Sequence, residues 1–199
     1  SKSNLDCMLE EIVDFDKVVF LYLNSLGSDN FDFYWLLITN KFSNFIIYLS
    51  LLLVVYRRYG KTNALIIFLL ALFLVAIVDQ TTNISKLFFA RPRPCYDEQI
   101  SLLSRLVTTN CGGKFSFFSG HASNSFALAT FFSYIFNKSK LLKTVILFLA
   151  LLVAYSRIYV GVHYPMDVII GILYGTFFSI IYTYIIKKYF NAIKLFISN

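Results

Sequence analysis

Long apolar runs separated by short polar segments dominate the chain. Five runs approach the roughly 20 residues that a helix needs to cross a bilayer, allowing for tilt and polar ends. They cover residues 31–56, 64–90, 123–136, 141–162 and 168–186. Thr39-Asn40-Lys41 interrupts the first run, which therefore predicts one crossing, an interfacial segment followed by a crossing, or two crossings. The pattern predicts an all-α, polytopic transmembrane helical bundle of five membrane helices, or six.

The first 30 residues have a different pattern, in which apolar residues recur every three or four positions among acidic ones. The apolar positions are Leu9, Ile12, Phe15, Val19, Tyr22 and Leu26, and the acidic ones are Asp6, Glu10, Glu11, Asp14 and Asp16. This pattern predicts an amphipathic N-terminal helix on the membrane surface. The acidic residues also argue against a secretory signal peptide, which opens with basic residues and has an uncharged centre.

The composition agrees with a membrane protein. Apolar residues make up 58% of the 199 residues and aromatic residues 19%, which is too apolar for a soluble domain of this length. The sequence contains no long linker, repeat or low-complexity tract, so it predicts a single membrane domain over residues 1–199.

Basic residues follow the first, third and fifth apolar runs, where no acidic residue occurs. They are Arg57, Arg58, Lys61, Lys138, Lys140, Lys143, Lys187, Lys188 and Lys194. Because short basic loops stay in the cytoplasm, we expect these regions to be cytoplasmic and the segments 91–120 and 156–167 to lie on the opposite face. These nine residues are half of the 18 basic residues, so the net charge of +7 does not indicate a nucleic-acid partner.

Three polar clusters lie at the ends of apolar runs on this opposite face. The clusters are Lys86 with Arg91 and Arg93, Ser119-Gly120-His121, and Arg157 with His163 and Asp167. Each has a simpler interpretation alone, since basic side chains snorkel to headgroups, a serine caps a helix and an aspartate caps the next one. Charge is costly at a membrane boundary, however, so the three clusters together indicate one composite site.

The residue types in these clusters favour phosphoryl transfer. A helix N-terminus at Gly120 attracts an anion, and Arg157 offers a guanidinium fork suited to phosphate oxygens. His163 and Asp167 are four residues apart, so the carboxylate can orient one imidazole nitrogen while the other attacks. Cationic donors, a nucleophile and an acid are the parts that such a reaction needs.

These motifs resemble those of the type 2 phosphatidic acid phosphatase (PAP2) superfamily of lipid phosphatases. The first family motif, lysine, six residues, arginine-proline, is met by Lys86 and Arg93-Pro94. The third, serine-arginine, five residues, histidine, three residues, aspartate, is met by Ser156-Arg157, His163 and Asp167. The second is usually proline-serine-glycine-histidine, whereas this chain has Phe118-Ser119-Gly120-His121. The resemblance covers roughly residues 64–186 and says little about the N-terminal helix.

The resemblance implies a helical bundle in which His163 attacks phosphorus and becomes a phosphohistidine. Asp167 would hold His163, and His121 would protonate the leaving oxygen. The phosphate oxygens would be held by Lys86, Arg93, Ser119, Gly120 and Arg157. Water would then release phosphate from His163, with no metal and no cofactor.

Residues outside the motifs leave alternatives open. Cys95 and Cys111 bracket the external loop and could form a disulfide or remain free thiols. Asp79, two helical turns before the first-motif lysine, could support an active-site cation or make a structural hydrogen bond between helices, which we favour. Tyr159 and Tyr164 are interpreted as residues of the interfacial aromatic belt rather than as catalysts.

The sequence therefore predicts an enzyme that removes phosphate from a lipid phosphate or diphosphate at the outer face of a bacterial inner membrane. A short external loop leaves little room for a headgroup-binding domain, which favours undecaprenyl diphosphate over lipid A, phosphatidylglycerol phosphate and phosphatidic acid. Vanadate haloperoxidases share the pocket chemistry, but they are typically large and soluble. A catalytically silent lipid-binding scaffold would not need both histidines and Asp167. The sequence does not specify an oligomeric state.

Overall fold

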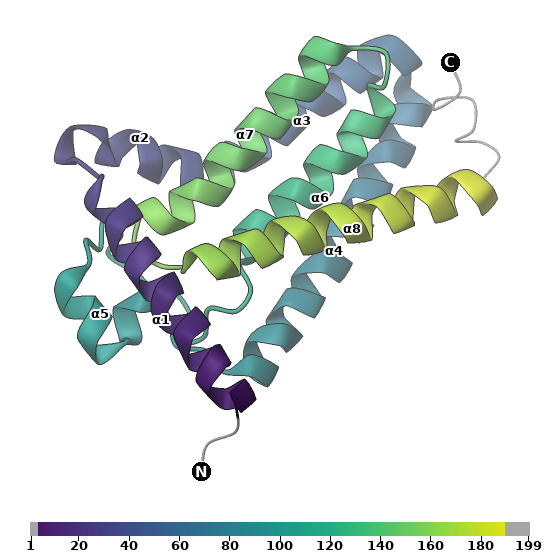
Figure 1. Ribbon diagram of the computed structural model, residues 1–199. Coiled ribbons are helices and arrows are strands. Elements are labelled where there is room, and N and C mark those ends of the chain that lie inside the picture. The colour runs from purple at the N-terminus through teal and green to yellow at the C-terminus, as the bar shows by residue number, and fades with distance from the viewer. Residues whose placement is uncertain (1–3, 190–199) are drawn as a thin grey trace.

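The computed structural model describes residues 4–189, which form eight α-helices and one short 3₁₀ helix (Figure 1). The helices are α1 (Asn4–Ser25), α2 (Asp29–Thr39), α3 (Lys41–Tyr59), α4 (Lys61–Phe89), η1 (Pro94–Tyr96), α5 (Glu98–Leu103), α6 (Gly120–Ile135), α7 (Lys140–Tyr159) and α8 (Pro165–Tyr189). Lys194, one of the basic residues that we expected on the cytoplasmic side, lies outside the described residues. The all-α prediction is confirmed for residues 4–189.

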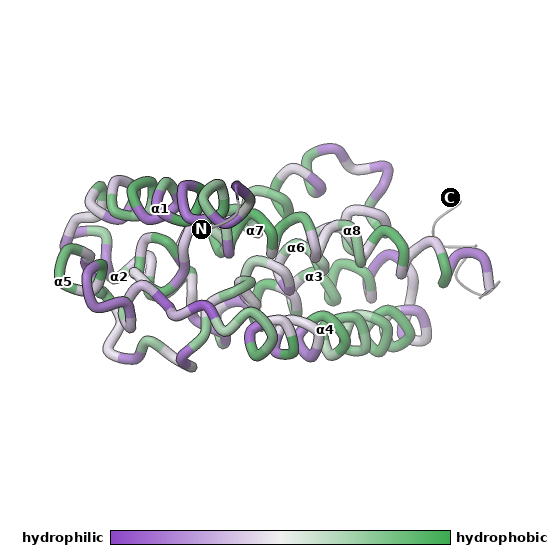
Figure 2. The backbone as a smooth tube through the Cα atoms, turned by 60° about the horizontal axis from the view of Figure 1, so that its bottom comes forward, coloured by the Kyte–Doolittle hydropathy of each residue, from purple (hydrophilic) through white to green (hydrophobic). Residues whose placement is uncertain are grey.

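Three helices, α4, α7 and α8, are each long and apolar enough to cross a membrane. Of these three, α4 contains the most apolar 18-residue stretch, and α1 alternates between apolar and polar residues (Figure 2). The pair of α2 and α3 meets the same requirement only together, with a bend of 56° between them. The structure therefore supports three crossings, or four with the bent pair. Helix α6 has only 16 residues, and its crossing of the membrane stays a prediction.

The bend between α2 and α3 lies at the polar interruption seen in the first apolar run. Asn40 ends α2 and caps α3, because its side chain accepts a hydrogen bond from the Phe42 N–H at 2.7 Å. Asn44 then donates to the carbonyls of Ile38 and Asn40, each at 3.0 Å. These side-chain bonds replace the backbone bonds that a continuous helix would make.

Helix α6 lies at the centre of the bundle, in contact with α4, α7 and α8. Two glycines let α8 approach the first turns of α6 closely, as small residues do in membrane helices. A side chain at Gly171 would meet the Ser119 carbonyl at 2.8 Å, and one at Gly175 would meet the backbone of Ser123. This contact fixes the start of α6 beside the start of α8.

Helix α1 lies across the end of the bundle where α8 begins (Figure 1). Asp16, Phe20 and Asn24, four residues apart, face inward and are almost fully buried. The predicted apolar positions Leu9 and Phe15 are exposed on the outer side. The N-terminal helix is thus confirmed, and the contact of its apolar positions with a membrane surface stays a prediction.

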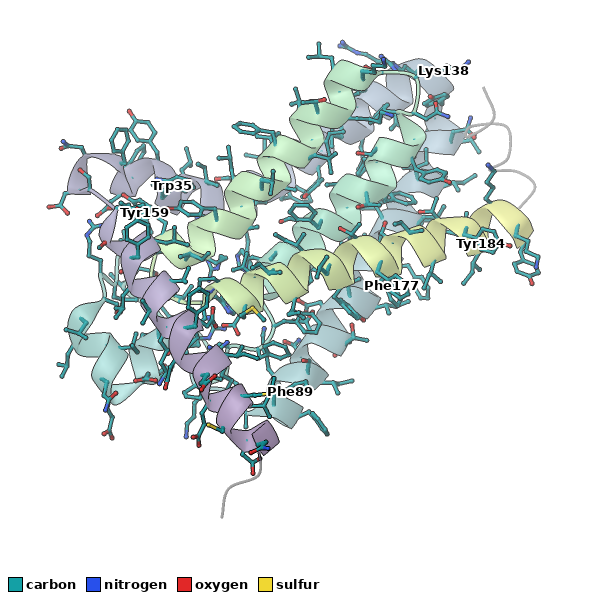
Figure 3. All side chains as sticks on the ribbon, in the orientation of Figure 1. Trp35, Phe89, Lys138, Tyr159, Phe177 and Tyr184 are labelled. Atoms are coloured by element: carbon teal, nitrogen blue, oxygen red, sulfur yellow. A yellow bond between two sulfur atoms is a disulfide. The ribbon has the colours of Figure 1, made fainter. Side chains whose placement is uncertain are left out.

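The basic turns and the polar clusters lie at opposite ends of the bundle. Lys138, in the turn between α6 and α7, is far from Trp35 and Tyr159 at the other end of α7 (Figure 3). Arg58, at the end of α3, lies over the ring of Phe136 at 5.7 Å and so belongs to the Lys138 end. This separation is the one that the charge pattern predicts.

Candidate active site

A cavity of about 1020 Å³ opens between α3, α4 and α6. Six of the eight predicted site residues line it, from all three motifs: Lys86, Arg93, Gly120, His121, Arg157 and His163. The other two, Ser119 and Asp167, are fully buried behind this wall. The cavity continues from the polar residues into an apolar part lined by residues such as Leu52, Phe68 and Phe132.

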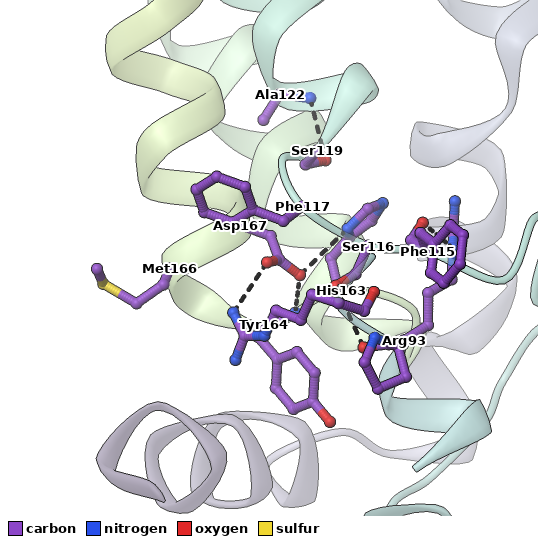
Figure 4. Close-up of polar contacts among 12 residues, drawn as sticks. Arg93, Phe115, Ser116, Phe117, Ser119, Ala122, His163, Tyr164, Met166 and Asp167 are labelled. Atoms are coloured by element: carbon purple, nitrogen blue, oxygen red, sulfur yellow. Dashed lines mark hydrogen bonds and ion pairs between the residues drawn. The ribbon is translucent and has the colours of Figure 1, made fainter. Parts of the chain in front are cut away.

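His163 lies in the polar wall, and Asp167 lies directly behind it (Figure 4). The Nδ1 atom of His163 lies 3.5 Å from Oδ2 of Asp167, and the His163 side chain is 2% exposed. The same Oδ2 accepts the Tyr164 N–H at 3.0 Å, which fixes the carboxylate. With Nδ1 facing the carboxylate, the other ring nitrogen of His163 is the one available to attack.

A tight turn brings Arg157 and His163 to the same wall. The N–H groups of Val162 and His163 both donate to the Arg157 carbonyl, at 3.1 and 3.2 Å. Gly161 makes this reversal possible with φ 84°, and a side chain there would collide with the backbone of Arg105. The turn therefore places the predicted nucleophile His163 beside Arg157, the predicted phosphate-binding guanidinium.

The N-terminus of α6 supplies backbone donors to the cavity. Ser119 caps the helix, since its Oγ accepts the Ala122 N–H at 3.4 Å, and its own N–H donates to the Asp167 carbonyl at 2.9 Å. The first turn of a helix has no internal acceptors for its N–H groups. In this turn, the N–H groups of Ser119 and Ala122 have the acceptors just named, which leaves the N–H groups of Gly120 and His121, and both of these residues line the cavity. The serine thus shapes an anion site whose N–H donors come from its neighbours.

The external loop holds Arg93 rigidly. Its Nε donates to the Phe115 carbonyl at 3.2 Å and its Nη1 to the Cys111 carbonyl at 2.9 Å. A disulfide joins Cys111 to Cys95, two residues after Arg93. The pairing that the sequence left open is therefore formed, and it closes the loop around this arginine.

Two segments that precede the three motifs also contact the site. They are α1 and the break after α2. Asp16 binds Arg91 (Oδ2 to Nη2, 2.7 Å), and Arg91 binds Asp167 (Nη1 to Oδ1, 2.9 Å). Asp16 also accepts the Met166 N–H at 2.9 Å. Arg91 is thus held between a carboxylate of α1 and the carboxylate that faces His163.

At the break after α2, the Thr39 hydroxyl accepts a hydrogen bond from Arg157, and the Thr39 backbone hydrogen-bonds His121. The only sequence signal for these residues was the polar interruption at Thr39-Asn40-Lys41. Nothing local marked Asp16, which is one of five acidic residues in its region.

The two tyrosines predicted in the aromatic belt are instead buried, and that prediction is wrong. Tyr164 is 1% exposed and carries Arg91 over its ring at 4.1 Å. Tyr159 is 4% exposed, donates to Asp32 at 2.9 Å and stacks on Trp35. Both rings tie the N-terminal helices to the site. Asp79 makes the expected bond between helices, accepting from Asn124 of α6 at 3.1 Å, and it also lines the cavity.

Burial sets the protonation state of the nucleophile. Burial lowers the pKa of His163 well below its ordinary value, and the neighbouring charges of Arg93, Arg157 and Lys86 lower it further. A neutral imidazole carries the lone pair that attack on phosphorus requires. The cavity thus combines a neutral imidazole, the predicted nucleophile, with the three cations that were predicted to bind phosphate oxygens.

Comparisons with known proteins agree with this chemistry. The model of the PAP2 superfamily matches residues 64–191. A lipid A 4'-phosphatase of Porphyromonas gingivalis is 33% identical over 189 residues, covering 92% of this chain and 80% of the relative. A lipid A 4'-phosphatase of Bacteroides thetaiotaomicron is 31% identical over 187 residues, covering 91% and 81%.

Two crystal structures are similar in fold. Aquifex aeolicus LpxE matches with a TM-score of 0.62 at 25% identity, covering 83% of this chain and 93% of that one. A transmembrane PAP2-type phosphatidylglycerolphosphate phosphatase of Bacillus subtilis matches with a TM-score of 0.72 at 17% identity, covering 91% and 89%. The family match over most of the chain and the two relatives above 30% identity place the chain in the PAP2 superfamily, as a membrane lipid phosphatase.

Proposed function

We propose that the protein removes a phosphate group from lipid A, and that the 4'-phosphate is the one removed. The observation that carries the proposal is one continuous cavity that passes from motif residues at one end to apolar side chains at the other. A phosphorylated lipid has the same order of groups. The two relatives named lipid A 4'-phosphatase, each aligned over more than nine tenths of this chain, favour lipid A among lipid phosphates.

In the first step, the free ring nitrogen of His163 attacks phosphorus and the P–O bond to the lipid breaks. Asp167 faces the other ring nitrogen at 3.5 Å and stabilises the positive charge that develops on the ring. Burial lowers the pKa of the His121 imidazole, and the negative charge of a bound phosphate opposes that shift. His121 then gives a proton to the leaving oxygen, so the lipid departs as an alcohol. Lys86, Arg93 and Arg157 and the N–H groups of Gly120 and His121 stabilise the charge on the phosphoryl oxygens.

In the second step, water attacks the phosphohistidine. His121, now neutral, accepts a proton from this water, and the P–N bond breaks to release inorganic phosphate and neutral His163. The scheme uses no metal, so the rate should be the same with and without EDTA.

Undecaprenyl diphosphate was favoured from sequence because the external loop is too short for a headgroup domain. That argument loses its basis, because a cavity of about 1020 Å³ is formed mainly by α3, α4 and α6, and the external loop contributes only Arg93 and residues 110–113 to its wall. Lipid A, considered among the alternatives, is better supported by the relatives.

We further propose that the site faces the outside of a bacterial inner membrane. The basic turns at Arg58 and Lys138 lie at the end of the bundle remote from the site, and short basic loops stay in the cytoplasm. In a Cys7→Ser background, which removes the exposed free thiol of α1, a cysteine introduced at Lys138 should therefore react with an impermeant thiol reagent only after cells are permeabilised. Labelling in intact cells would reverse this orientation.

The direct test is phosphate release by detergent-purified protein with EDTA present. The substrates are bis-phosphorylated lipid A, undecaprenyl diphosphate, phosphatidylglycerol phosphate and phosphatidic acid. We expect lipid A to give the highest kcat/KM, mass spectrometry to show loss of the 4'-phosphate, and His163→Ala to be inactive while unfolding at the wild-type temperature. Efficient hydrolysis of another lipid with lipid A untouched would refute the substrate assignment.

A further inference from the structure

The cavity wall changes character in the same order on three helices. On α4, the lining residues include Lys86, Asn83, Asp79, Val75, Leu72 and Phe68. They recur every three or four residues, so they form one face of the helix. This face runs from a cation, through two polar residues, to apolar side chains.

Helices α6 and α3 repeat this order from the same end. The cavity side of α6 presents His121, then Asn124, then Leu128. That of α3 presents Lys41, then Asn44, then Tyr48. The polar residue is three positions from the end residue on each helix, or about 4.5 Å along the axis.

The cavity therefore has a polar layer between its phosphate end and its apolar part. We call Asn44, Asp79, Asn83 and Asn124 the acceptor layer, because all four line the cavity and carry side-chain oxygens that can accept hydrogen bonds.

The amide nitrogens of this layer are already engaged. Asn44 donates to two backbone carbonyls, and Asn83 and Asn124 donate to the two carboxylate oxygens of Asp79, at 3.2 and 3.1 Å. These partners can only accept, so they fix which end of each side-chain amide is nitrogen. The amide oxygens remain, and that of Asn124 is buried without a partner.

A buried amide oxygen without a donor is unfavourable unless a ligand supplies one. Ligand groups that could do so are hydroxyls and amide N–H groups. A phosphate offers only acceptors and negative charge, and the Asp79 carboxylate would repel it. The layer therefore suits an uncharged, donor-rich group on the leaving side of the scissile bond.

We propose that the acceptor layer binds the sugar ring that carries the scissile phosphate, by accepting hydrogen bonds from its hydroxyl and amide N–H groups. The inference rests on the proposed lipid A phosphatase activity and explains it. A glycolipid phosphate places a sugar at this depth, whereas a polyprenyl diphosphate places a second phosphate or its hydrocarbon chain there. Phosphatidic acid has no donor at this position.

The test compares substrates within each protein preparation. The kcat/KM values for lipid A, undecaprenyl diphosphate and phosphatidic acid are measured for wild type, Asn124→Ala and Asp79→Asn. Gln80→Ala is the matched control, because Gln80 is exposed beside Asp79 and is not part of the cavity wall. Ratios between substrates cancel any loss of folded protein.

For Asn124→Ala we expect the ratio of lipid A to phosphatidic acid to fall about tenfold, which is the loss of roughly one hydrogen bond. For Asp79→Asn we expect the ratio of lipid A to undecaprenyl diphosphate to fall by at least about tenfold, because the repulsion of a second phosphate is also removed. Gln80→Ala should keep both wild-type ratios.

Equal losses on all three substrates would overturn the inference, since they would mean that these residues only support the phosphate end. Lipid A hydrolysis by wild type with unaltered ratios in both variants would also overturn it, while leaving the proposed function in place. A wild type that hydrolyses undecaprenyl diphosphate and not lipid A would remove both.

Discussion

The contact between Asp16 and Arg91 predicts that a helix outside the three motifs controls the rate of the chemical step. The variant Asp16→Asn keeps the side-chain shape and the oxygen that accepts the Met166 N–H, but it removes the charge that faces Arg91 at 2.7 Å. Arg91 then has Asp167 as its remaining carboxylate partner in this network. It would draw negative charge away from the side of Asp167 that faces His163.

The structure sets the size of the effect. Breaking a buried ion pair costs about 3–5 kcal/mol when the remaining charge is left alone. Arg91 keeps Asp167 and the Tyr164 ring, and its side chain is 18% exposed, so the loss of one charged hydrogen bond, about 2 kcal/mol of stability, is the better estimate. We expect kcat to fall about tenfold, equivalent to about 1.4 kcal/mol in the barrier, with KM changed less than about threefold.

The assay is steady-state phosphate release from lipid A as a function of pH. Burial raises the pKa of Asp16, with hydrogen bonds from Arg91 and Met166 opposing the shift. Its carboxylate is charged above that raised pKa and becomes neutral as the pH falls through it. At low pH, the kcat of wild type should therefore approach that of Asp16→Asn. The difference in kcat between the two proteins should be largest at neutral pH and shrink on acidification.

The matched control is Lys17→Gln on the same helix. Lys17 pairs with Asp97 at 3.0 Å, so this variant weakens the docking of α1 without removing a partner of Arg91. If Lys17→Gln lowers kcat as much as Asp16→Asn, the effect is only loss of helix docking. If Asp16→Asn has wild-type kcat at neutral pH, the positioning argument is wrong.

Three further predictions concern the polar wall. Because the pKa of His163 lies well below its ordinary value of 6.5, the reactive neutral form is lost only as the pH falls through that lowered pKa, and the acid limb of kcat/KM should have its midpoint below pH 6.5. Thr39→Val removes the hydroxyl that accepts from Arg157, and kcat/KM for lipid A should fall about tenfold with little change in unfolding temperature; an unchanged value would mean that Arg157 needs no support. Cys95→Ser opens the disulfide to Cys111, so KM should rise several-fold, and a reducing agent should raise the KM of wild type but not of the variant.

The parts of the fold predicted from sequence are those with a local signal. Continuous apolar runs predicted α4, α7 and α8, and the prolines at positions 92 and 165 mark where α4 has ended and α8 begins. The polar interruption predicted a discontinuity between α2 and α3, and the structure shows it as a bend of 56° capped by Asn40. The motif spacing led to six residues that line one cavity.

The contacts that were missed join residues far apart in the sequence. Asp16 and Arg91 are 75 positions apart, and Thr39 and Arg157 are 118 apart. Hydrophobic periodicity predicted an amphipathic helix at α1. It could not show that Asp16 is buried while the other four acidic residues of this helix are exposed. The two tyrosines were misplaced for a related reason, because a residue at the end of an apolar run is equally compatible with lipid and with a neighbouring helix.

The Asp16–Arg91 contact indicates how much of the chain an active enzyme needs. The family match begins at residue 64, and a shortened gene starting there would encode all three motifs. Its product would lack the carboxylate that shares Arg91, the hydroxyl that accepts from Arg157 and the α3 wall of the cavity. The unit that is recognised by sequence is thus smaller than the unit that must be inserted and assembled before catalysis can begin. A protein engineer who grafts these motifs onto another bundle would have to transfer α1 to α3 with them.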